Sequence, residues 1–564
     1  MSNRFGLSVT VWLVAAGLGA AAVSGQIPVQ QVQVDRSRLE RIEDLSEAFA
    51  NDMLELSVSV RNRDLRRVAD FFADSLEAQA FPSQPGELKT EVKWIRSHRW
   101  SMTESTVPGR PAISREEFLA GWGGFLDHFS EVEDARFKVK QADFESPEVA
   151  RTNARLAFYV VGRDDSGRRE WARGAALVTA VREENGPWRI RSFKLLSLDS
   201  MVAAEEIFSE VSIPAGVDVA LPPYGSPSNN GFVWHGAAAG DLNNDGLIDL
   251  FVTGSKGNYL YLNEGNGKFR DVSLESEVKT LLVPATQPLI LDYDNDGDSD
   301  LFISAVGSQV LLRNRLIPDG KMAFEDVSVE AGVDAGAVGF SAAAGDVNGD
   351  GFPDIYVGSY NRYGFVTPDS WYRATNGTPN LLFINQKNGT FREEGTRYGV
   401  ADRRWSYAAA FADVNGDGRL DLYVANDFGE KALYINKGDG FVDEARERGV
   451  LDPGNGMGVA FGDFNNDGLL DIHATNMSST AGNRILSRLF PQSNVRENVL
   501  LKLTSGNNLF ENMGEGRFRD VTSEVGGFGG GWAWGGGFID FDNDGWEDIY
   551  TPNGFISGKS MKDT

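Results

Sequence analysis

A nine-residue pattern, D-x-[DN]-x-D-G-x-x-D, occurs six times in the second part of the chain. Positions 1, 3, 5 and 9 always carry an oxygen-bearing side chain, position 6 is always Gly, and position 4 is always Asn or Gly. Gly and Asn tolerate the left-handed backbone that a sharp loop requires. The pattern therefore predicts six sharp loops, numbered here loop 1 to loop 6, at residues 241–249, 292–300, 346–354, 413–421, 463–471 and 540–548.

The oxygen atoms of these loops predict cation binding. Position 7 is unconstrained, as expected of a residue that contributes only its backbone carbonyl. Four side chains and one carbonyl approach the six to eight oxygens that Ca²⁺ takes, whereas Mg²⁺ prefers a tighter octahedron. A solvated turn would explain one copy but not six. We predict about six Ca²⁺ sites, with these ligands: Asp241, Asn243, Asp245, Leu247, Asp249, Asp292, Asp294, Asp296, Asp298, Asp300, Asp346, Asn348, Asp350, Phe352, Asp354, Asp413, Asn415, Asp417, Arg419, Asp421, Asp463, Asn465, Asp467, Leu469, Asp471, Asp540, Asp542, Asp544, Trp546 and Asp548.

The sequence around the loops predicts β-structure rather than an EF-hand. Position 12 is never acidic, although an EF-hand needs a bidentate Glu there and a helix on each side. Small apolar residues precede each loop, a β-rich segment follows it, and a predicted hairpin comes next, as at 381–395. Loop starts lie 50 to 77 residues apart. Four short strands per unit at this period predict the blades of a β-propeller, with insertions near 361–380 and 478–507 on a propeller face.

These loops resemble the FG-GAP or VCBS repeats of the integrin α-subunit propeller, and the L-x-x-N-x-G-x-G-x-F-x-D-V hairpins make the chain similar to the ASPIC/UnbV family over residues 208–554. The resemblance implies a seven-bladed propeller with calcium in the blade loops, followed by a C-terminal ASPIC/UnbV domain. The chain departs from the family because it ends sixteen residues after loop 6. Either an outer strand at 208–218 closes a six-bladed ring, or the chain is a fragment whose seventh blade and tail are missing. We favour the fragment.

The N-terminal region predicts a signal peptide and a separate domain. Residues 1–25 have a short basic start and an apolar stretch, as in a secretory signal peptide, with an uncleaved anchor as the alternative. Residues 26–35 form a linker. Helices are predicted over 35–75 and 114–129, the second capped by Ser114 with Glu117, and four alternating strands follow between 135 and 198. The expected fold class is multidomain, an N-terminal α+β domain over 36–200 and then an all-β propeller over 206–564.

The α+β region is similar to the SnoaL/NTF2-like class, whose members include isomerases and hydrolases with Asp/His pairs as well as proteins that only bind or dimerise. Asp127 and His128 are adjacent on the second predicted helix and would point about 100° apart, which makes them a poor catalytic pair. Aromatic and basic residues could line a pocket, but we expect core packing: Trp94, Arg96, Trp100 and Trp122.

The composition of the chain argues against several classes of function. The net charge of −27 argues against nucleic-acid binding, and the absence of Cys excludes disulfides, thiolate metal sites and a catalytic thiol. No metal-type His spacing and no phosphate-binding loop is present, so no catalytic residue is assigned. We expect a secreted or periplasmic calcium-binding scaffold that binds a protein or glycan on a propeller face, without nucleic acid and without a membrane span once the signal peptide is removed. The alternatives are an enzyme, acting in the NTF2-like pocket or on glycans, and a structural envelope or matrix component.

Overall fold

A computed structural model describes residues 36–553 except 83–84, 93, 101–112, 147, 183–185, 204, 206–207, 219–235, 255–256, 280–283, 363–364, 480–481, 483–485, 487–497 and 527–530. The predicted signal peptide, the linker, His235 and the end of the chain lie outside the described residues. The described chain forms two compact units: an N-terminal unit of residues up to 209 together with the described residues between 480 and 494, and a second unit of residues 210–479 and 495–553. Each unit is described by itself.

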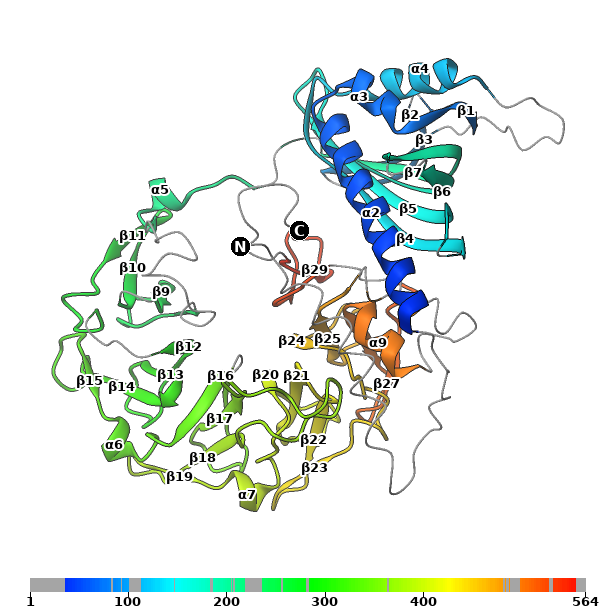
Figure 1. Cartoon of the computed structure of the whole chain (residues 1–564). Coiled ribbons are helices and arrows are strands. Elements are labelled where there is room, and N and C mark those ends of the chain that lie inside the picture. Colours follow the sequence, from blue (N-terminus) through cyan, green and yellow to red (C-terminus); the bar gives the residue numbers. More distant parts are fainter. Residues whose placement is uncertain are drawn as a thin grey trace. The chain divides into compact units, whose positions relative to one another are not determined.

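The N-terminal unit combines helices with one seven-stranded sheet (Figure 1). The strand order is β2-β3-β7-β6-β5-β4, and β1 pairs with β7 in parallel. The helices are α2 Arg36–Arg61, α3 Leu65–Asp70 and α4 Arg115–Leu126. The strands are β1 Phe72–Ala78, β2 Pro85–Val92, β3 Ile95–Trp100, β4 Glu131–Ser146, β5 Val149–Arg163, β6 Arg169–Arg182 and β7 Trp188–Ala203.

The helix predicted over 35–75 is wrong at its C-terminal end. Helix α2 ends at Arg61, and Arg63 adopts a positive φ of 55°, which no helix can continue through. Asp64 then caps α3 by accepting the Arg67 N–H, and β1 begins at Phe72. Strand β1 thus begins inside the predicted helix, and β2 and β3 lie in the Pro- and Gly-containing segment between the two predicted helices, where no strand was predicted. Pairing of β1 and β3 with β7, and of β2 with β3, stabilises these strands.

The second predicted helix and the four later strands are confirmed. Helix α4 begins after Ser114, whose side chain accepts the Glu117 N–H while the Glu117 carboxylate accepts the Ser114 N–H, forming the expected capping box. Strands β4 to β7 alternate buried and exposed residues along most of their length. This alternation places one face of the sheet on a core, as period-2 patterning predicts.

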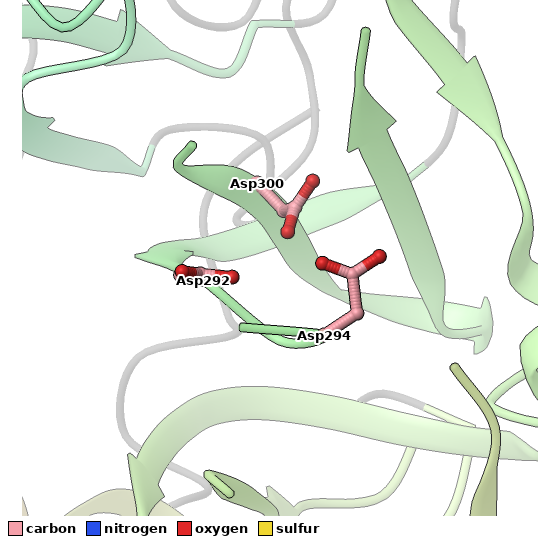
Figure 2. A group of neighbouring side chains, drawn as sticks. All are labelled: Asp292, Asp294 and Asp300. Atoms are coloured by element: carbon pink, nitrogen blue, oxygen red, sulfur yellow. The ribbon is translucent and has the colours of Figure 1, made fainter. Parts of the chain in front are cut away.

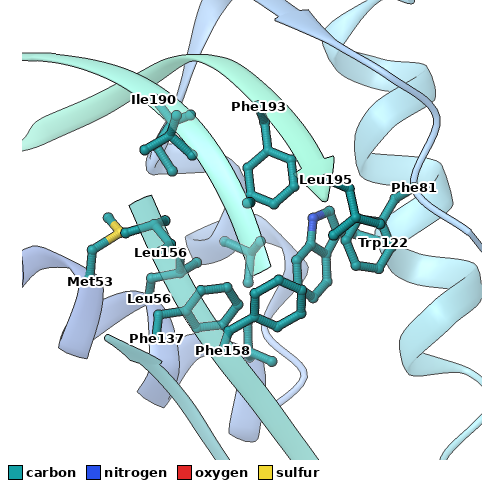
Figure 3. Close-up of a cluster of buried hydrophobic side chains, with 14 of the residues drawn as sticks. Met53, Leu56, Phe81, Trp122, Phe137, Leu156, Phe158, Ile190, Phe193 and Leu195 are labelled. Carbon is teal, nitrogen blue, oxygen red and sulfur yellow. The ribbon is translucent and has the colours of Figure 1, made fainter. Parts of the chain in front are cut away.

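Aromatic side chains fill the interior of the N-terminal unit (Figure 3). The rings of Phe81 and Trp122 stack with centroids 4.2 Å apart, and those of Phe137 and Phe158 stack at 5.0 Å. Trp100 and Trp122 are fully buried, in agreement with the expected core role. The expectation is wrong for Arg96, which is exposed and pairs with Glu91 at 2.8 Å, and Trp94 is only partly buried. The concave side of this sheet is therefore packed with rings.

The second unit is built from successive sets of four antiparallel strands, called here blade 1 to blade 5, and a final strand pair (Figure 1). Blades 2 and 3 are joined into one eight-stranded sheet, because residues 306–308 pair with residues 336–338. Blade 1 holds β8 Ala237–Gly240, β9 Asp249–Val252, β10 Tyr259–Gly265 and β11 Lys268–Asp271. Blades 2 and 3 hold β12 Ala285–Leu291, β13 Asp300–Ser308, β14 Val310–Asn314 and β15 Phe324–Asp326, then β16 Gly336–Gly345, β17 Asp354–Ser359, β18 Leu381–Asn385 and β19 Phe391–Glu393. Blades 4 and 5 hold β20 Ser406–Ala412, β21 Asp421–Asn426, β22 Ala432–Asn436 and β23 Phe441–Asp443, then β24 Gly456–Gly462, β25 Asp471–Asn476, β26 Asn508–Asn512 and β27 Phe518–Asp520, and the last pair is β28 Gly537–Ile539 with β29 Asp548–Tyr550.

The first strands of consecutive blades contact one another in succession. Strand β8 contacts β12, which contacts β16, and the series continues through β20 and β24 to β28. Hydrophobic clusters lie between consecutive blades; one joins residues of blades 3 and 4, such as Tyr356 and Val424. Innermost strands that follow one another around an axis are the arrangement of a β-propeller. The predicted fold class, α+β followed by all-β, is confirmed.

Short helical turns precede blade 1 and connect blade 2 to blade 3 and blade 3 to blade 4. They are α5 Ser212–Ala215, α6 Ser328–Ala331 and α7 Gly395–Tyr398, each ended by a Gly with positive φ. A fourth Gly, Gly449 (φ 87°), follows β23 in the same way. Its backbone lies so close to the next blade that a Cβ atom would come within 2.4 Å of the Phe518 carbonyl oxygen. Residues 208–211, where an outer strand had been considered, are not in a strand.

Within the described part of the chain, none of the helices has both the length and the apolar character needed to span a bilayer. A further helix, α9 Val499–Ser505, lies between β25 and β26.

Candidate metal-binding loops

Each of the six loops connects the first and second strands of a sheet in the second unit, as predicted. The residues at positions 4 and 6 have positive φ in every loop; Asn244 and Gly246 of loop 1 have φ values of 58° and 84°. The requirement for Asn or Gly at position 4 and Gly at position 6 is therefore confirmed, and its cause is the left-handed backbone.

Backbone amides hold the same side chains in all six loops. In loop 1 the carboxylate of Asp241 accepts the N–H groups of Asp245 and Gly246, at 3.2 and 2.8 Å. The Asp245 carboxylate accepts the N–H of Leu247 at 2.8 Å. Equivalent bonds recur in loops 2 to 6. Positions 1 and 5 are thus oriented before any ligand binds.

The position 9 aspartates of loops 1 to 5 are buried. In loop 3 the two oxygens of Asp354 accept the N–H groups of Asn385 and Val347, at 2.8 and 3.1 Å. Burial raises the pKa of Asp354 to about 7 and that of Asp300 in loop 2 to about 8. Two backbone N–H groups therefore do not fully compensate the loss of solvation, and a nearby cation would favour the charged form.

Three carboxylates converge in loops 2 and 6. Oxygens of Asp292, Asp294 and Asp300 all lie within 4.8 Å of one another, and Figure 2 shows these three side chains grouped around the loop. The equivalent group in loop 6 comprises Asp540, Asp542 and Asp548. In loops 1, 3, 4 and 5 position 3 is Asn, so an amide oxygen replaces the middle carboxylate there.

Unpartnered oxygens support the fit to a hard cation. Oδ1 of Asp294 and Oδ1 of Asn348, both at position 3, are buried and accept no hydrogen bond. Carboxylate and amide oxygens are the donors that Ca²⁺ prefers. The residues present therefore fit calcium, with positions 1, 3 and 9 brought together by the fold.

Asp298, at position 7 of loop 2, is a special case. Its side chain is 2% exposed, and one carboxylate oxygen accepts the Ile317 N–H at 2.6 Å. Burial raises its pKa to about 6. This fifth aspartate of loop 2 is held by the segment after β14, a role that its position in the sequence did not indicate.

The loops differ in what contacts the second oxygen of the position 5 aspartate. In loops 1 and 5 the donor is the amide of the position 3 Asn, as in the 2.9 Å bond from Asn243 to Asp245. In loop 3 it is Lys387, with Nζ 3.5 Å from Asp350 Oδ2. In loop 4 it is Arg419. Among the described residues, no side chain donates to this oxygen in loops 2 and 6.

An Asn ends the third strand of blades 2 to 5, and its role was not predicted from the sequence. Asn436 donates from Nδ2 to the carbonyl oxygen of Val347 in loop 3, at 2.8 Å, and so joins blade 4 to blade 3. The same bond to the preceding loop recurs from Asn314, Asn385 and Asn512. The invariant Asn of the predicted hairpins was the available signal.

The N-terminal unit contains a different polar pair from the one considered. The side chain of Asp127 forms an ion pair with Arg63 at 3.0 Å, so Asp127 and His128 are not partners. His128 Nε2 instead lies 2.6 Å from Oε2 of Glu170, which is buried. The hydrogen bond to Glu170 raises the pKa of His128.

The loops and strands of the second unit are similar to the FG-GAP-like repeat. The model of the FG-GAP-like repeat matches residues 241–303, 292–357, 368–424, 413–474 and 498–551. The chain is related to cartilage acidic protein 1. It is 26% identical to the Mus musculus protein over 298 residues, which cover 41% of this chain and 45% of that protein, and 24% identical to the Homo sapiens protein, with 41% and 44% covered. The chain thus spans less than half the length of these relatives.

Two solved structures also align with parts of the chain. One is an Agrocybe aegerita lectin solved for its recognition of non-reducing terminal N-acetylglucosamine, at 15% identity, with 72% of this chain and 86% of that chain covered and a TM-score of 0.31. The other is a ketosteroid isomerase-like protein from Erwinia carotovora atroseptica, at 15% identity, with 28% and 95% covered and a TM-score of 0.18.

Proposed function

We propose that the second unit is a calcium-stabilised propeller scaffold of a secreted or periplasmic protein, and that it binds a protein or glycan partner. The observation that carries the proposal is the repeated loop geometry. Between the first and second strands of every blade and of the final strand pair, backbone amides orient the acidic side chains of positions 1 and 5. The ligands are those predicted from the sequence, at positions 1, 3, 5 and 9 with the carbonyl of position 7.

An extracytoplasmic location agrees with this chemistry. Residues 1–25 have the sequence of a signal peptide. Extracellular calcium modules bind with dissociation constants of about 10⁻⁴ to 10⁻³ M, which suits exposed loops of this kind. The calcium would be structural, because it neutralises carboxylates that hold neighbouring strands together.

Thermal unfolding tests the calcium proposal. A ligand that binds only the folded state raises stability by RT ln(1 + [L]/Kd) per site. In millimolar calcium the transition of the second unit should rise by many degrees relative to chelator, while that of the N-terminal unit stays in place. The double variant Asp294→Asn and Asp542→Asn, which removes one converging carboxylate from each of loops 2 and 6, should reduce the shift. Equal transitions with and without calcium would refute the proposal.

An aromatic cluster suggests where the partner binds. Phe340, Trp371 and Tyr407 are partly exposed and pack on the buried ring of Tyr360 and its neighbours. The cluster includes residues of the 361–380 insertion, which follows the end of β17 away from loop 3. Phe365 of this insertion is 91% exposed. Aromatic side chains of this kind dominate the energetics of protein interfaces.

Variants at this cluster test the partner proposal. Phe365→Ser should abolish or strongly weaken binding to a glycan array, or to partners captured from calcium-containing medium. Phe365 precedes the cluster residue Val366 in the 361–380 insertion. Leu274→Ser is the matched control, because Leu274 is also highly exposed but follows β11 of blade 1 and is not part of the insertion. Equal effects of the two variants would place the binding surface elsewhere.

A second candidate function is an activity of the N-terminal unit. The buried carboxylate of Glu170 beside His128 is the kind of pair that acid–base chemistry uses. The aromatic packing around Trp122 opposes it, because rings occupy the interior. If the His128→Gln variant binds the partner with the same affinity as the parent protein does, partner binding and an activity of the N-terminal unit are separate functions.

A further inference from the structure

Loop 4 differs from the other loops at position 7. Arg419 occupies this position, where loops 1 and 5 have Leu247 and Leu469. Its Nη2 lies 2.5 Å from Asp417 Oδ2, and its Nε donates to the Asn436 carbonyl oxygen at 3.1 Å. A guanidinium is therefore held directly on the position 5 aspartate of this loop.

We propose that Arg419 is a built-in competitor for calcium, so that loop 4 is the last of the six loops to fill. This inference rests on the proposed calcium binding. A Ca²⁺ ion at loop 4 needs the carboxylate of Asp417, and a guanidinium kept on that carboxylate would repel the ion at short range. Charge-assisted hydrogen bonds are stronger than the amide bond that occupies the same oxygen in loops 1 and 5.

The Arg419 side chain, once displaced from Asp417, can move into a neighbouring cavity. A cavity of about 400 Å³ lies beside loop 4, between blades 4 and 5, and Arg419 is part of its wall. Glu447 and Glu515 also line this cavity, and neither carboxylate has an ion-pair partner among the described residues. Calcium binding at loop 4 would thus exchange one ion pair for another and rearrange the surface between the two blades.

Of the other basic groups that line the cavity, Lys437 and Arg448 are engaged, whereas the structure gives the Arg517 side chain no ion pair among the described residues. Lys437 and Arg448 both pair with Glu444. The Arg448 guanidinium also donates to the Glu515 backbone carbonyl. Because Glu444 is occupied, the carboxylates of Glu447 and Glu515 are the acceptors available to Arg419.

Loop 3 shows a weaker form of the same feature. The Lys387 ammonium lies 3.5 Å from Asp350 and comes from the strand β18 side rather than from the loop itself. Its Nζ also donates to the Asp350 carbonyl oxygen at 3.2 Å. The ammonium is a point charge on a flexible stem and lies farther from its carboxylate than the Arg419 guanidinium, which is 2.5 Å from Asp417, so it is easier to displace. Loop 4 is therefore expected to be the weakest site.

A reciprocal pair of variants tests the proposal. Loops 4 and 5 share the pattern D-x-N-x-D-G-x-L-D and differ at position 7, so Arg419→Leu gives loop 4 the residue of loop 5, and Leu469→Arg does the opposite. Calcium is titrated into the full chain by calorimetry and by equilibrium dialysis. We expect Arg419→Leu to strengthen the weakest binding step by roughly three- to tenfold and Leu469→Arg to weaken one site by a similar factor.

Several outcomes are distinguishable. An unchanged isotherm for Arg419→Leu, in a protein that binds several calcium ions, would overturn the inference while leaving the proposed function intact. A parent protein that binds no calcium would overturn both. Arg419→Gln, which keeps a polar side chain, provides a second variant if the Leu variant is unstable in chelator. The double variant Glu447→Gln and Glu515→Gln should weaken the last step further, and an unchanged step would exclude these residues as acceptors.

Discussion

The bond from Asn436 to the preceding blade yields a quantitative prediction. Asn436 is 1% exposed, and its Nδ2 donates to the carbonyl oxygens of Val347 at 2.8 Å and Leu420 at 3.2 Å. Its Oδ1 accepts the N–H of Gly438 at 2.8 Å. Each such bond contributes about 1 kcal/mol net, and buried partners left unsatisfied add to the loss. Asn436→Ala should therefore lower the free energy of unfolding of the second unit by about 3–4 kcal/mol.

The equivalent residue of blade 1 is the matched control. Asn263 donates to the Ile248 carbonyl oxygen and accepts the Gly265 N–H, and its side chain is only partly buried. The structure gives it no bond to another blade among the described residues. Asn263→Ala should cost about 1 kcal/mol, since it loses two partly solvated hydrogen bonds.

Urea or guanidinium unfolding at fixed calcium, with fluorescence detection, measures both variants. The difference of about 2–3 kcal/mol corresponds to a few degrees in Tm for a unit of this size. Equal losses for the two variants would refute the idea that this Asn joins blades, and would leave it only the role of shaping its own hairpin.

Two further predictions concern the backbone and pH. Gly449→Ala should destabilise the second unit by about 1–3 kcal/mol, because the new Cβ would contact Phe518 and the φ value is unfavourable for Ala. Gly438→Ala is the control and should cost less, because Gly438 also has a positive φ but has open space around it. Denaturant midpoints compare the two variants, and equal losses would show that the contact with Phe518 does not contribute. The hydrogen bond to Glu170 raises the pKa of His128 above its ordinary value, so the stability it contributes is fully present below about pH 6.5 and is lost as pH rises through the folded-state pKa. The N-terminal unit should therefore melt lower at pH 9 than at pH 6, and an identical pH dependence in His128→Gln would assign the effect to another group.

Local chemistry made much of this fold predictable. Few residue types tolerate the positive φ values at positions 4 and 6 of the loops. The residue types there therefore predict the backbone conformation directly, as at Asn244 and Gly246. The capping box of Ser114 is equally local. In contrast, β1 to β3 escaped prediction because their pairing, rather than their own composition, stabilises them: β1 and β3 pair with β7, more than 80 residues later, and β2 pairs with β3.

The sequence by itself determined which atoms each loop offers, since the identity and spacing of the acidic residues are local properties. Only the tertiary structure decided which of those oxygens meet and what else contacts them. Asp300 is buried by the packing of its blade, Asn436 reaches a carbonyl 89 residues earlier, and Arg419 closes on Asp417 beside a cavity formed by the next blade. These differences between six nearly identical sequences arise from contacts between segments far apart in the chain, which no nine-residue pattern contains.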